Sequence, residues 1–471
     1  MWERCSYYGM RALLVLFMVD SIKGGLGFSD RTATAIYGLY TALVYLAALP
    51  GGWIADRLLG AQRSVWFGGM IIAAGHFTLA IPATQTFFLG LLFVVLGTGL
   101  LKPNISVIVG ELYPEGGARR DAGFSIFYMG INLGAFIGPL VCSFLGEKIN
   151  WHYGFAAAGV GMLLGLLQFK LTAKHLGDAG LRTRRKTDAA ERRLDKGWYF
   201  VAAGMGTVVL LVGLGLTGVV KFNPVPLAQN ATYVIVGLGV IYFAGMFLFG
   251  KLDGGEKKRS VALIILLLAS AMFWSGFEQA GSSLNLFAER YTHRVIAALR
   301  FEIPAGWFQS LNPVFIITFA PVFAALWVAL ARRNLNPSLP AKFALGLVLL
   351  GMGFLVMAVA SRLVVSGGQV LPFWLITTYL IHTFGELCLS PVGLSAVTKL
   401  APRRFVGQMM GLWFLATSLG NLIAGLIAGQ LAGGAEQVAW MFLRVVLTTA
   451  GAGVLLLLLV RPMRKLIGDI R

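Results

Sequence analysis

Long apolar segments recur along the whole chain, separated by short stretches rich in Gly, Pro and charged residues. A helix crosses the hydrocarbon core of a bilayer with roughly 20 such residues, whereas a membrane barrel shows shorter segments of alternating polarity. The pattern therefore predicts fourteen membrane-spanning helices, at residues 1–22, 32–55, 64–83, 86–112, 121–145, 151–172, 197–219, 231–250, 261–288, 308–331, 341–362, 371–398, 405–432 and 437–460.

Lys and Arg gather in alternate loops between these spans. Cytoplasmic loops carry the excess of positive charge, so these loops and both termini are predicted to be cytoplasmic. The loop at 289–302, with Arg290, Arg294 and Arg300, is an exception on the outer side. The basic stretches are 56–63, 116–121, 174–196, 251–260, 331–338, 399–405 and 461–471, and the intervening stretches 82–86, 221–230 and 432–437 are nearly free of Lys and Arg.

The longest basic linker follows the sixth predicted span. If spans seven and eight are an inserted hairpin, the chain is an all-α polytopic membrane protein with two six-helix bundles. The predicted parts are an N-terminal bundle (1–172), a basic cytoplasmic linker with a transmembrane hairpin (173–258) and a C-terminal bundle (259–471). Two such halves around a central cavity are the plan of the major facilitator superfamily.

Composition supports the membrane interpretation and limits the function classes. Hydrophobic residues make up 57% and charged residues 13% of the chain, about half the charged fraction usual in soluble proteins. The net charge of +19 comes from the loops, so membrane lipid and not nucleic acid is the expected partner. Cys5, Cys142 and Cys388 fall within spans and are expected to be free thiols. We find no nucleophile–base pair, metal-ligand spacing or phosphate loop, so an enzyme is not expected.

The first span carries several charged and aromatic residues on one face. Glu3, Arg4, Tyr7, Tyr8 and Arg11 are spaced by three and four, which predicts a polar face directed at a cavity or another helix. The alternative is that Arg4 and Arg11 are cytoplasmic anchors, since a charge near the membrane edge costs little.

Three ionisable residues lie deep inside other spans, where insertion costs at least ~2.5 kcal/mol each. Lys102 lies beside Pro103, too far from either end for its side chain to reach the headgroups. Glu278 and Glu386 lie in the middle of two later spans. A buried carboxyl that gains and loses a proton at modest cost can link proton flow to a conformational change.

Asn132 and Asn312 place amides inside apolar spans. Each could join two helices, a role worth about 0.6 kcal/mol, or line a cavity. His382, one turn before Glu386, is expected to be a satisfied polar neighbour. With cations in the first half and acids in the second, a cavity between the halves would suit a zwitterion, and the amides would suit a peptide bond.

These residues resemble the POT/PTR family of proton-dependent oligopeptide transporters, which belongs to the major facilitator superfamily, and the inserted hairpin is a feature of its bacterial members. The first span is similar to the end of the family motif E-x-x-E-R-[FY]-x-Y-Y-G, and the segment 51–63 is similar to the family's loop between helices two and three. Further segments match in order over nearly the whole chain: LLKPN (100–104), FSIFYMGINLG (124–134), FEQAGSSL (277–284), WFQSLNP (307–313), GELCLSPVGLS (385–395) and MMGLWFLATSLGN (409–421).

The resemblance implies a role for each matching residue. It implies that Arg4 and Lys102 meet the peptide carboxylate, that Glu386 meets the amino terminus, and that Asn132 and Asn312 contact the peptide backbone. It implies that Glu3 and Glu278 couple to protons, Glu278 by exchanging between Lys102 and Arg11, and that Arg31 and Glu289 form an outer gate pair. The resemblance further implies that the pockets for the peptide side chains are lined by Tyr7, Tyr8, Tyr45, Trp413 and Thr417.

The sequence departs from the family pattern at two places. The first glutamate of the motif would precede Met1, so we expect the natural protein to begin upstream. Gly38 stands where mammalian members carry a histidine, so proton coupling is expected to depend on carboxylates.

The predicted function is proton-coupled import of di- and tripeptides by alternating access, by a monomer in the bacterial inner membrane. No cofactor is expected, since the proton gradient supplies the driving force. The alternatives are a carrier of nitrate or another anion, a drug/proton antiporter, and a receptor that senses peptide without transport. Glu386 argues against the anion carrier, and Lys102 with Arg4 argues against the export of cationic drugs.

Overall fold

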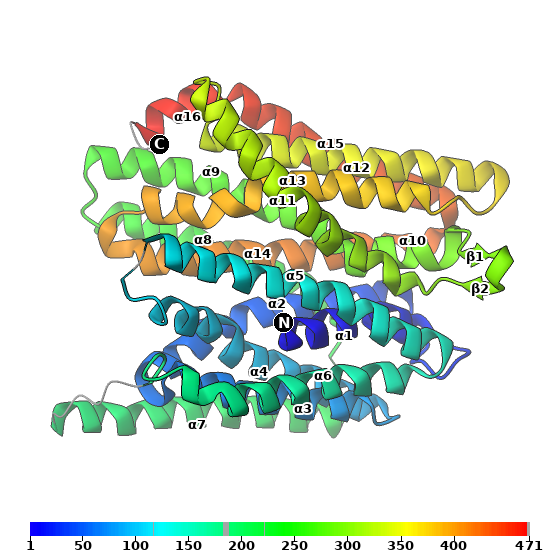
Figure 1. Cartoon of the computed structure of the whole chain (residues 1–471), viewed down its shortest axis with the longest axis horizontal. Helices are drawn as coiled ribbons and strands as arrows, with labels where there is room; N and C mark the ends of the chain where they lie inside the picture. The colour runs from blue at the N-terminus through cyan, green and yellow to red at the C-terminus, as the bar shows by residue number, and fades with distance from the viewer. Residues whose placement is uncertain (116, 182–187, 221, 469–471) are drawn as a thin grey trace. The chain divides into compact units, whose positions relative to one another are not determined.

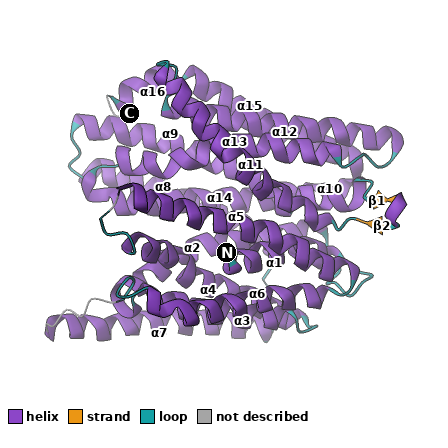
Figure 2. Cartoon of the chain, in the orientation of Figure 1, coloured by secondary structure: helices purple, strands orange, loops and turns teal. Residues whose placement is uncertain are grey.

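The computed structural model describes residues 1–115, 117–181, 188–220 and 222–468, and it is built almost entirely of long helices (Figures 1 and 2). The basic run 182–186 of the predicted linker lies outside the described residues. The helices are α1 (Trp2–Val19), α2 (Asp30–Ile54), α3 (Ala61–Leu79), α4 (Thr84–Glu111), α5 (Gly117–Lys148), α6 (Trp151–Thr172), α7 (Asp188–Leu216), α8 (Pro224–Phe249), α9 (Gly254–Phe277), α10 (Ser283–Tyr291), α11 (Leu311–Arg332), α12 (Leu339–Gly367), α13 (Phe373–Leu400), α14 (Val406–Ala428), α15 (Gly434–Leu458) and α16 (Val460–Ile467).

Every predicted span coincides with helical structure. Among the described residues, twelve helical segments are long and apolar enough to cross a membrane, and the two other expected spans are the helices α1 and α3. The chain is therefore a multi-pass membrane protein, while the count of fourteen spans stays a prediction.

The predicted span 261–288 is interrupted in its middle. Helix α9 ends at Phe277, a 3₁₀ turn covers Glu278–Gly281, and α10 begins at Ser283. Gln279 of the turn is bonded to both flanking helices: its amide donates to the Ser275 carbonyl of α9, and the Ser283 hydroxyl of α10 donates to its side-chain oxygen. Such local side-chain bonds compete with helix continuation. The break places Glu278 at a helix end inside the apolar segment.

The short strands β1 (Val295–Ile296) and β2 (Phe301–Glu302) pair antiparallel and follow α10, as Figure 2 shows. Residue Val295 lies opposite Glu302 in this hairpin. The hairpin occupies the exceptional basic loop of the sequence pattern.

The chain divides into two compact units. The first unit comprises residues 1–10 and 43–227, and the second comprises 11–42 and 228–471. In the first, α3 packs on α4 and α6 around a core that includes Val65, Ile72 and Leu101. In the second, α12 runs beside α15 and α13, and α9 packs on α14 (Figure 1). The predicted boundaries at 172 and 258 stay a prediction.

Helices α2 and α4 approach closely at two glycines of the first unit. A Cβ on Gly51 would collide with the backbone carbonyl of Gly99, and a Cβ on Gly99 would lie 2.6 Å from the Ala47 carbonyl oxygen. Pro103 lacks the N–H that would otherwise bond the Gly99 carbonyl in a regular helix. Small residues allow this close helix contact in a membrane, where packing drives association.

Replacing Gly51 by alanine is expected to destabilise this contact, because backbone atoms have no rotamer with which to make room. We expect a loss of about 1–3 kcal/mol in the free energy of unfolding, as for other overpacked sites. Thermal melting of the purified protein measures it. Gly52→Ala is the matched control, since a Cβ there meets nothing within 4 Å; equal melting temperatures for the two variants would contradict the contact.

Candidate functional site

The first turns of α1 carry the predicted charged face. Arg4 Nε lies 3.2 Å from Glu3 Oε2, and both side chains are nearly buried. The rings of Tyr7 and Tyr8 contact each other edge to face, with centroids 5.3 Å apart. A Cβ on Gly134 of α5 would collide with the Met1 carbonyl, so that glycine lets α5 pack against the start of α1. The positive charge of Arg4 is thus matched by Glu3 in this structure.

Lys102 of α4 lies over the ring of Tyr45, with its Nζ 3.6 Å from the ring centroid. The negative face of an aromatic ring attracts an ammonium group, and the attraction grows as water is removed. Both residues belong to the first unit and both are predicted site residues. The structure therefore brings a predicted carboxylate-binding cation and a predicted pocket residue together.

Asn132 of α5 is also in the first unit, and 5% of it is exposed. Its amide nitrogen donates to the Tyr128 carbonyl of its own helix at 3.0 Å. The amide oxygen remains the group with which Asn132 could accept a bond from a substrate N–H.

Arg11 and Glu278 form a buried ion pair in the second unit. Arg11 Nη2 lies 3.1 Å from Glu278 Oε2, and both side chains are less than a tenth exposed. Gly281, in the same turn as Glu278, leaves room for the Tyr37 hydroxyl and for Arg11. One turn later, the Asn285 amide donates to the Ala12 carbonyl at 2.8 Å. The helix break at Glu278 and the middle of α1 are therefore joined by an ion pair and a hydrogen bond.

Asn312 of α11 and Glu386 of α13 are in direct contact. The Asn312 amide donates to Glu386 Oε2 at 2.9 Å and to the Thr383 hydroxyl at 3.1 Å. One lone pair of the carboxylate is thereby fixed, while the group retains capacity to accept further bonds. Sequence reasoning proposed separate contacts for Asn312 and Glu386 and missed Thr383, which shows no distinguishing pattern. His382 bonds the Leu350 carbonyl at 3.1 Å, as expected of a satisfied polar neighbour.

Trp413 and Thr417 lie one turn apart on α14. Trp413 is buried against Phe343, and its ring lies directly over Gly393, where a Cβ would collide with it. The Thr417 hydroxyl donates to the Trp413 carbonyl at 3.1 Å. These contacts make Trp413 a rigid apolar wall in the second unit.

Gly38 of α2 faces α14 in the second unit. A Cβ there would lie 3.1 Å from both the Asn421 carbonyl oxygen and the Cα of Gly425. A histidine at this position would require the two helices to move apart. The dependence of proton coupling on carboxylates stays a prediction.

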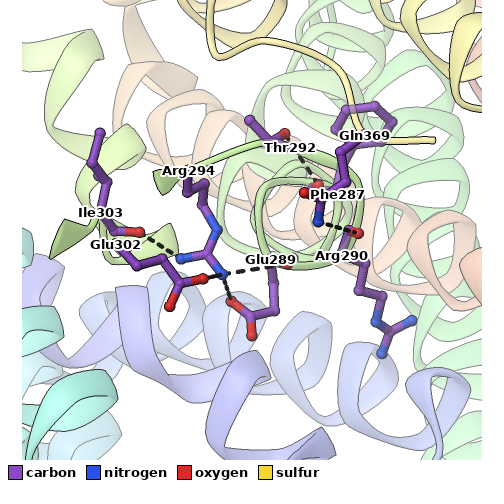
Figure 3. A network of polar contacts seen from close by, with 8 residues as sticks. All are labelled: Phe287, Glu289, Arg290, Thr292, Arg294, Glu302, Ile303 and Gln369. Atoms are coloured by element: carbon purple, nitrogen blue, oxygen red, sulfur yellow. Dashed lines mark hydrogen bonds and ion pairs between the residues drawn. The ribbon is translucent and has the colours of Figure 1, made fainter. Parts of the chain in front are cut away.

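The predicted gate residues Arg31 and Glu289 have other surroundings. Arg31 is exposed, and Glu289 pairs with Arg294 at 2.7 Å (Figure 3). One residue away on each helix, Asp30 and Arg290 form a two-pronged pair at 2.6 and 2.7 Å that the sequence did not predict. The gate role of Arg31 and Glu289 stays a prediction.

The predicted site residues therefore form local groups within each unit. The first unit holds Glu3 with Arg4 and Tyr45 with Lys102, while the second holds Arg11 with Glu278 and Asn312 with Glu386. The sequence pattern placed Arg11 among the cations of the N-terminal half. In the structure, Arg11 pairs with Glu278, an acid of its own unit. Among the described residues, no group of three or more His, Cys, Asp or Glu side chains is placed to hold a metal ion.

Comparison with known proteins identifies close relatives over the full chain. The family profile described as PTR2, POT family, matches residues 62–441. The chain is 45% identical to the peptide transporter YePEPT of Yersinia enterocolitica over an alignment of 481 positions, which covers 100% of this chain and 93% of that protein. It is 37% identical to a di-/tripeptide transporter of Lactococcus lactis, covering 100% of this chain and 95% of the relative.

A solved structure agrees equally well. The crystal structure of a peptide transporter POT in complex with sulfate superimposes with a TM-score of 0.91 at 43% identity, covering 99% of this chain and 93% of that one. Agreement over this length shows that the two chains share one fold.

Proposed function

Since the chain belongs to the POT family, which has the major facilitator fold, we propose that it imports di- and tripeptides together with protons. The relatives named above are peptide transporters, and the polar residues within the spans of this chain supply groups for both ends of a peptide. The contact between Asn312 and Glu386 carries the proposal, because it fixes a carboxylate inside an apolar span.

Recognition uses the charged ends that every unmodified short peptide has. Arg4 and Lys102 bind the terminal carboxylate, and Glu386 binds the terminal ammonium group. The side-chain oxygens of Asn132 and Asn312 accept hydrogen bonds from the peptide backbone, and aromatic side chains such as Trp413 line the pockets for the peptide side chains. The further pocket residues are Tyr7, Tyr8, Tyr45 and Thr417. Main-chain and terminal groups are common to all di- and tripeptides, so this arrangement supports broad recognition.

Proton coupling uses the buried pair of Arg11 and Glu278. Protonation of Glu278 removes the charge that holds Arg11, so the pair opens and the helix break at 278–281 can change its conformation. A bistable element of this kind is needed to convert proton binding into alternating access. Glu3, paired with Arg4, is the second candidate proton carrier.

The remaining features follow from this proposal. The protein acts as a monomer in a bacterial inner membrane, with both termini in the cytoplasm where its basic loops gather. It needs no cofactor, because the proton gradient supplies the free energy.

Uptake by liposomes that contain the purified protein tests the proposal. We expect labelled dialanine to accumulate when the outside is acidic and to equilibrate without accumulating when the gradient is collapsed. Equal accumulation of dialanine with and without the proton gradient would refute symport. Uptake of nitrate or a cationic drug in place of peptide would favour another carrier, and peptide binding without counterflow would identify a receptor.

A further inference from the structure

Arg294 is a buried cation at the centre of the polar network that follows α10. Its guanidinium contacts the Glu289 carboxylate at 2.7 Å, the Glu302 carboxylate at 3.0 Å and the Ile303 carbonyl (Figure 3). Only 5% of the Arg294 side chain is exposed, whereas the two carboxylates are about two-fifths exposed. A guanidinium offers five donors in a rigid fork, so it can bind several acceptors at once.

The segment that Arg294 holds contains little regular structure of its own, and outside the hairpin the His293 N–H donates to the Val370 carbonyl at 2.8 Å. The strands β1 and β2 have two residues each, and an isolated hairpin is at best marginally stable in water. One backbone bond, from Ile303 N–H to the Arg294 carbonyl, closes the hairpin at its base. The Arg294 side chain adds a second connection at the same place, because it binds the Glu302 carboxylate of β2 and the Ile303 carbonyl.

The same side chain reaches back to the last turn of α10. Glu289 is followed directly by Arg290, whose guanidinium binds both oxygens of Asp30 at the start of α2. The Gln369 amide donates to the Arg290 carbonyl, and the Val370 N–H donates to the Tyr291 carbonyl. The end of α10 is thus held on one side by Arg294 and on another by the segment before α13.

We propose that Arg294 is a positioning residue for the Asp30–Arg290 pair: by binding Glu289, Glu302 and Ile303 together, it fixes the end of α10 so that Arg290 reaches the start of α2. The hydrogen bonds and ion pairs of the Arg294 side chain are made with Glu289, Glu302 and Ile303 and not with Asp30 or Arg290, so the effect passes through the α10 backbone. In the transport cycle, which rests on the proposed function, this connection controls how readily the ends of α2 and α10 separate.

Hydrogen–deuterium exchange of the purified full-length protein tests this. In Arg294→Gln we expect exchange to become about tenfold faster at residues 292–303, and also in the first turns of α2 near Asp30, because local opening costs less free energy. Arg294→Lys should give an intermediate result, since an ammonium cannot form the same forked contacts. Arg300→Gln is the matched control, because Arg300 is an exposed arginine of the same hairpin.

The effect on α2 separates positioning from local stabilisation. Arg290→Gln removes the ion pair without changing α2, and it should by itself accelerate exchange at the start of α2. Adding Arg294→Gln to that variant should change nothing further there, although residues 292–303 should still exchange faster. If Arg294→Gln accelerates only the hairpin, or if its effect on α2 persists in the Arg290→Gln background, the proposal is wrong.

These measurements need no transport activity. A failure of peptide uptake in the wild-type protein would count against the proposed function and leave this result intact. In liposomes, Arg294→Gln is expected to change the maximal rate of dialanine uptake by about fivefold with little change in KM, as for an altered conformational equilibrium. A change confined to KM would contradict the inferred role in transport.

Discussion

Replacing Glu278 by glutamine is expected to abolish proton-driven accumulation of dialanine, while counterflow exchange of the peptide continues. Glutamine has nearly the size of glutamic acid but carries no proton that it can lose. Arg11 then meets the same neutral group whatever the proton gradient, so the gradient no longer drives the conformational change. Counterflow needs only peptide binding and alternation, and it therefore survives.

The Glu278→Gln protein is also expected to be less stable. Arg11 is 6% exposed, and the variant leaves its charge without the carboxylate 3.1 Å away. Breaking a buried pair from one side costs about 3–5 kcal/mol. Removing both charges in Arg11→Gln with Glu278→Gln should recover part of this loss, since the buried charge of Arg11 is then removed as well. Thermal melting of the wild type, the two single variants and the double variant measures the coupling between Arg11 and Glu278.

Glu436→Gln is the matched control, because Glu436 is an exposed acid in the first turn of α15 and its loss changes the net charge equally. It should leave both accumulation and melting unchanged. Proton-driven accumulation by Glu278→Gln at the wild-type level would show that protons couple through another group, with Glu3 the next to test.

The sequence was sufficient to predict the helices, because each apolar segment can cross the bilayer as a helix without help from the rest of the chain. A helix forms all its backbone bonds internally, so its existence does not depend on distant residues. The interruption after Phe277 was missed for the same reason: the segment remains apolar enough to span, and the turn is stabilised by local bonds of Gln279 and Ser283.

Pairwise contacts were less predictable than elements. Neighbouring residues on a helix point about 100° apart, so an error of one position selects a different partner. The start of α2 and the end of α10 give an example, because the pair in the structure is Asp30 with Arg290, one residue on each helix from Arg31 and Glu289, whose pairing as a gate stays a prediction. The partnership of Asn312 with Glu386 spans 74 positions, and no local pattern encodes it.

Replacing Glu386 by glutamine is expected to weaken the binding of dialanine about 100-fold, because the ammonium group of the peptide loses its carboxylate. Truncating one partner of a hydrogen-bonded charge pair in a desolvated place costs roughly 2–5 kcal/mol. Binding is measured by the concentration dependence of thermal stabilisation of the purified protein.

Binding of N-acetyl-dialanine tests whether the missing charge interaction causes the loss of dialanine affinity in Glu386→Gln. This acetylated peptide lacks the ammonium charge, so wild-type protein should bind it weakly and Glu386→Gln should bind it about as well as wild-type does. The interaction with Glu386 is therefore measured by the ratio of the affinity for dialanine to the affinity for N-acetyl-dialanine, and not by the affinity for dialanine alone. Equal losses for both peptides would mean that the substitution damaged the site in general, and the role of Glu386 would have to be abandoned.

Thr383→Val is the matched control for the surroundings of Glu386. It removes the second acceptor of the Asn312 amide, the Thr383 hydroxyl at 3.1 Å, and keeps the shape and the carboxylate. A neutral hydrogen bond contributes about 0.5–1.5 kcal/mol, so we expect a loss of dialanine affinity of about tenfold at most. The affinity ratio between dialanine and its acetylated form should stay that of the wild type, because the charge that distinguishes them is still present. We therefore expect the contact between Asn312 and Thr383 to orient the peptide, and the charge of Glu386 to select for its free amino terminus.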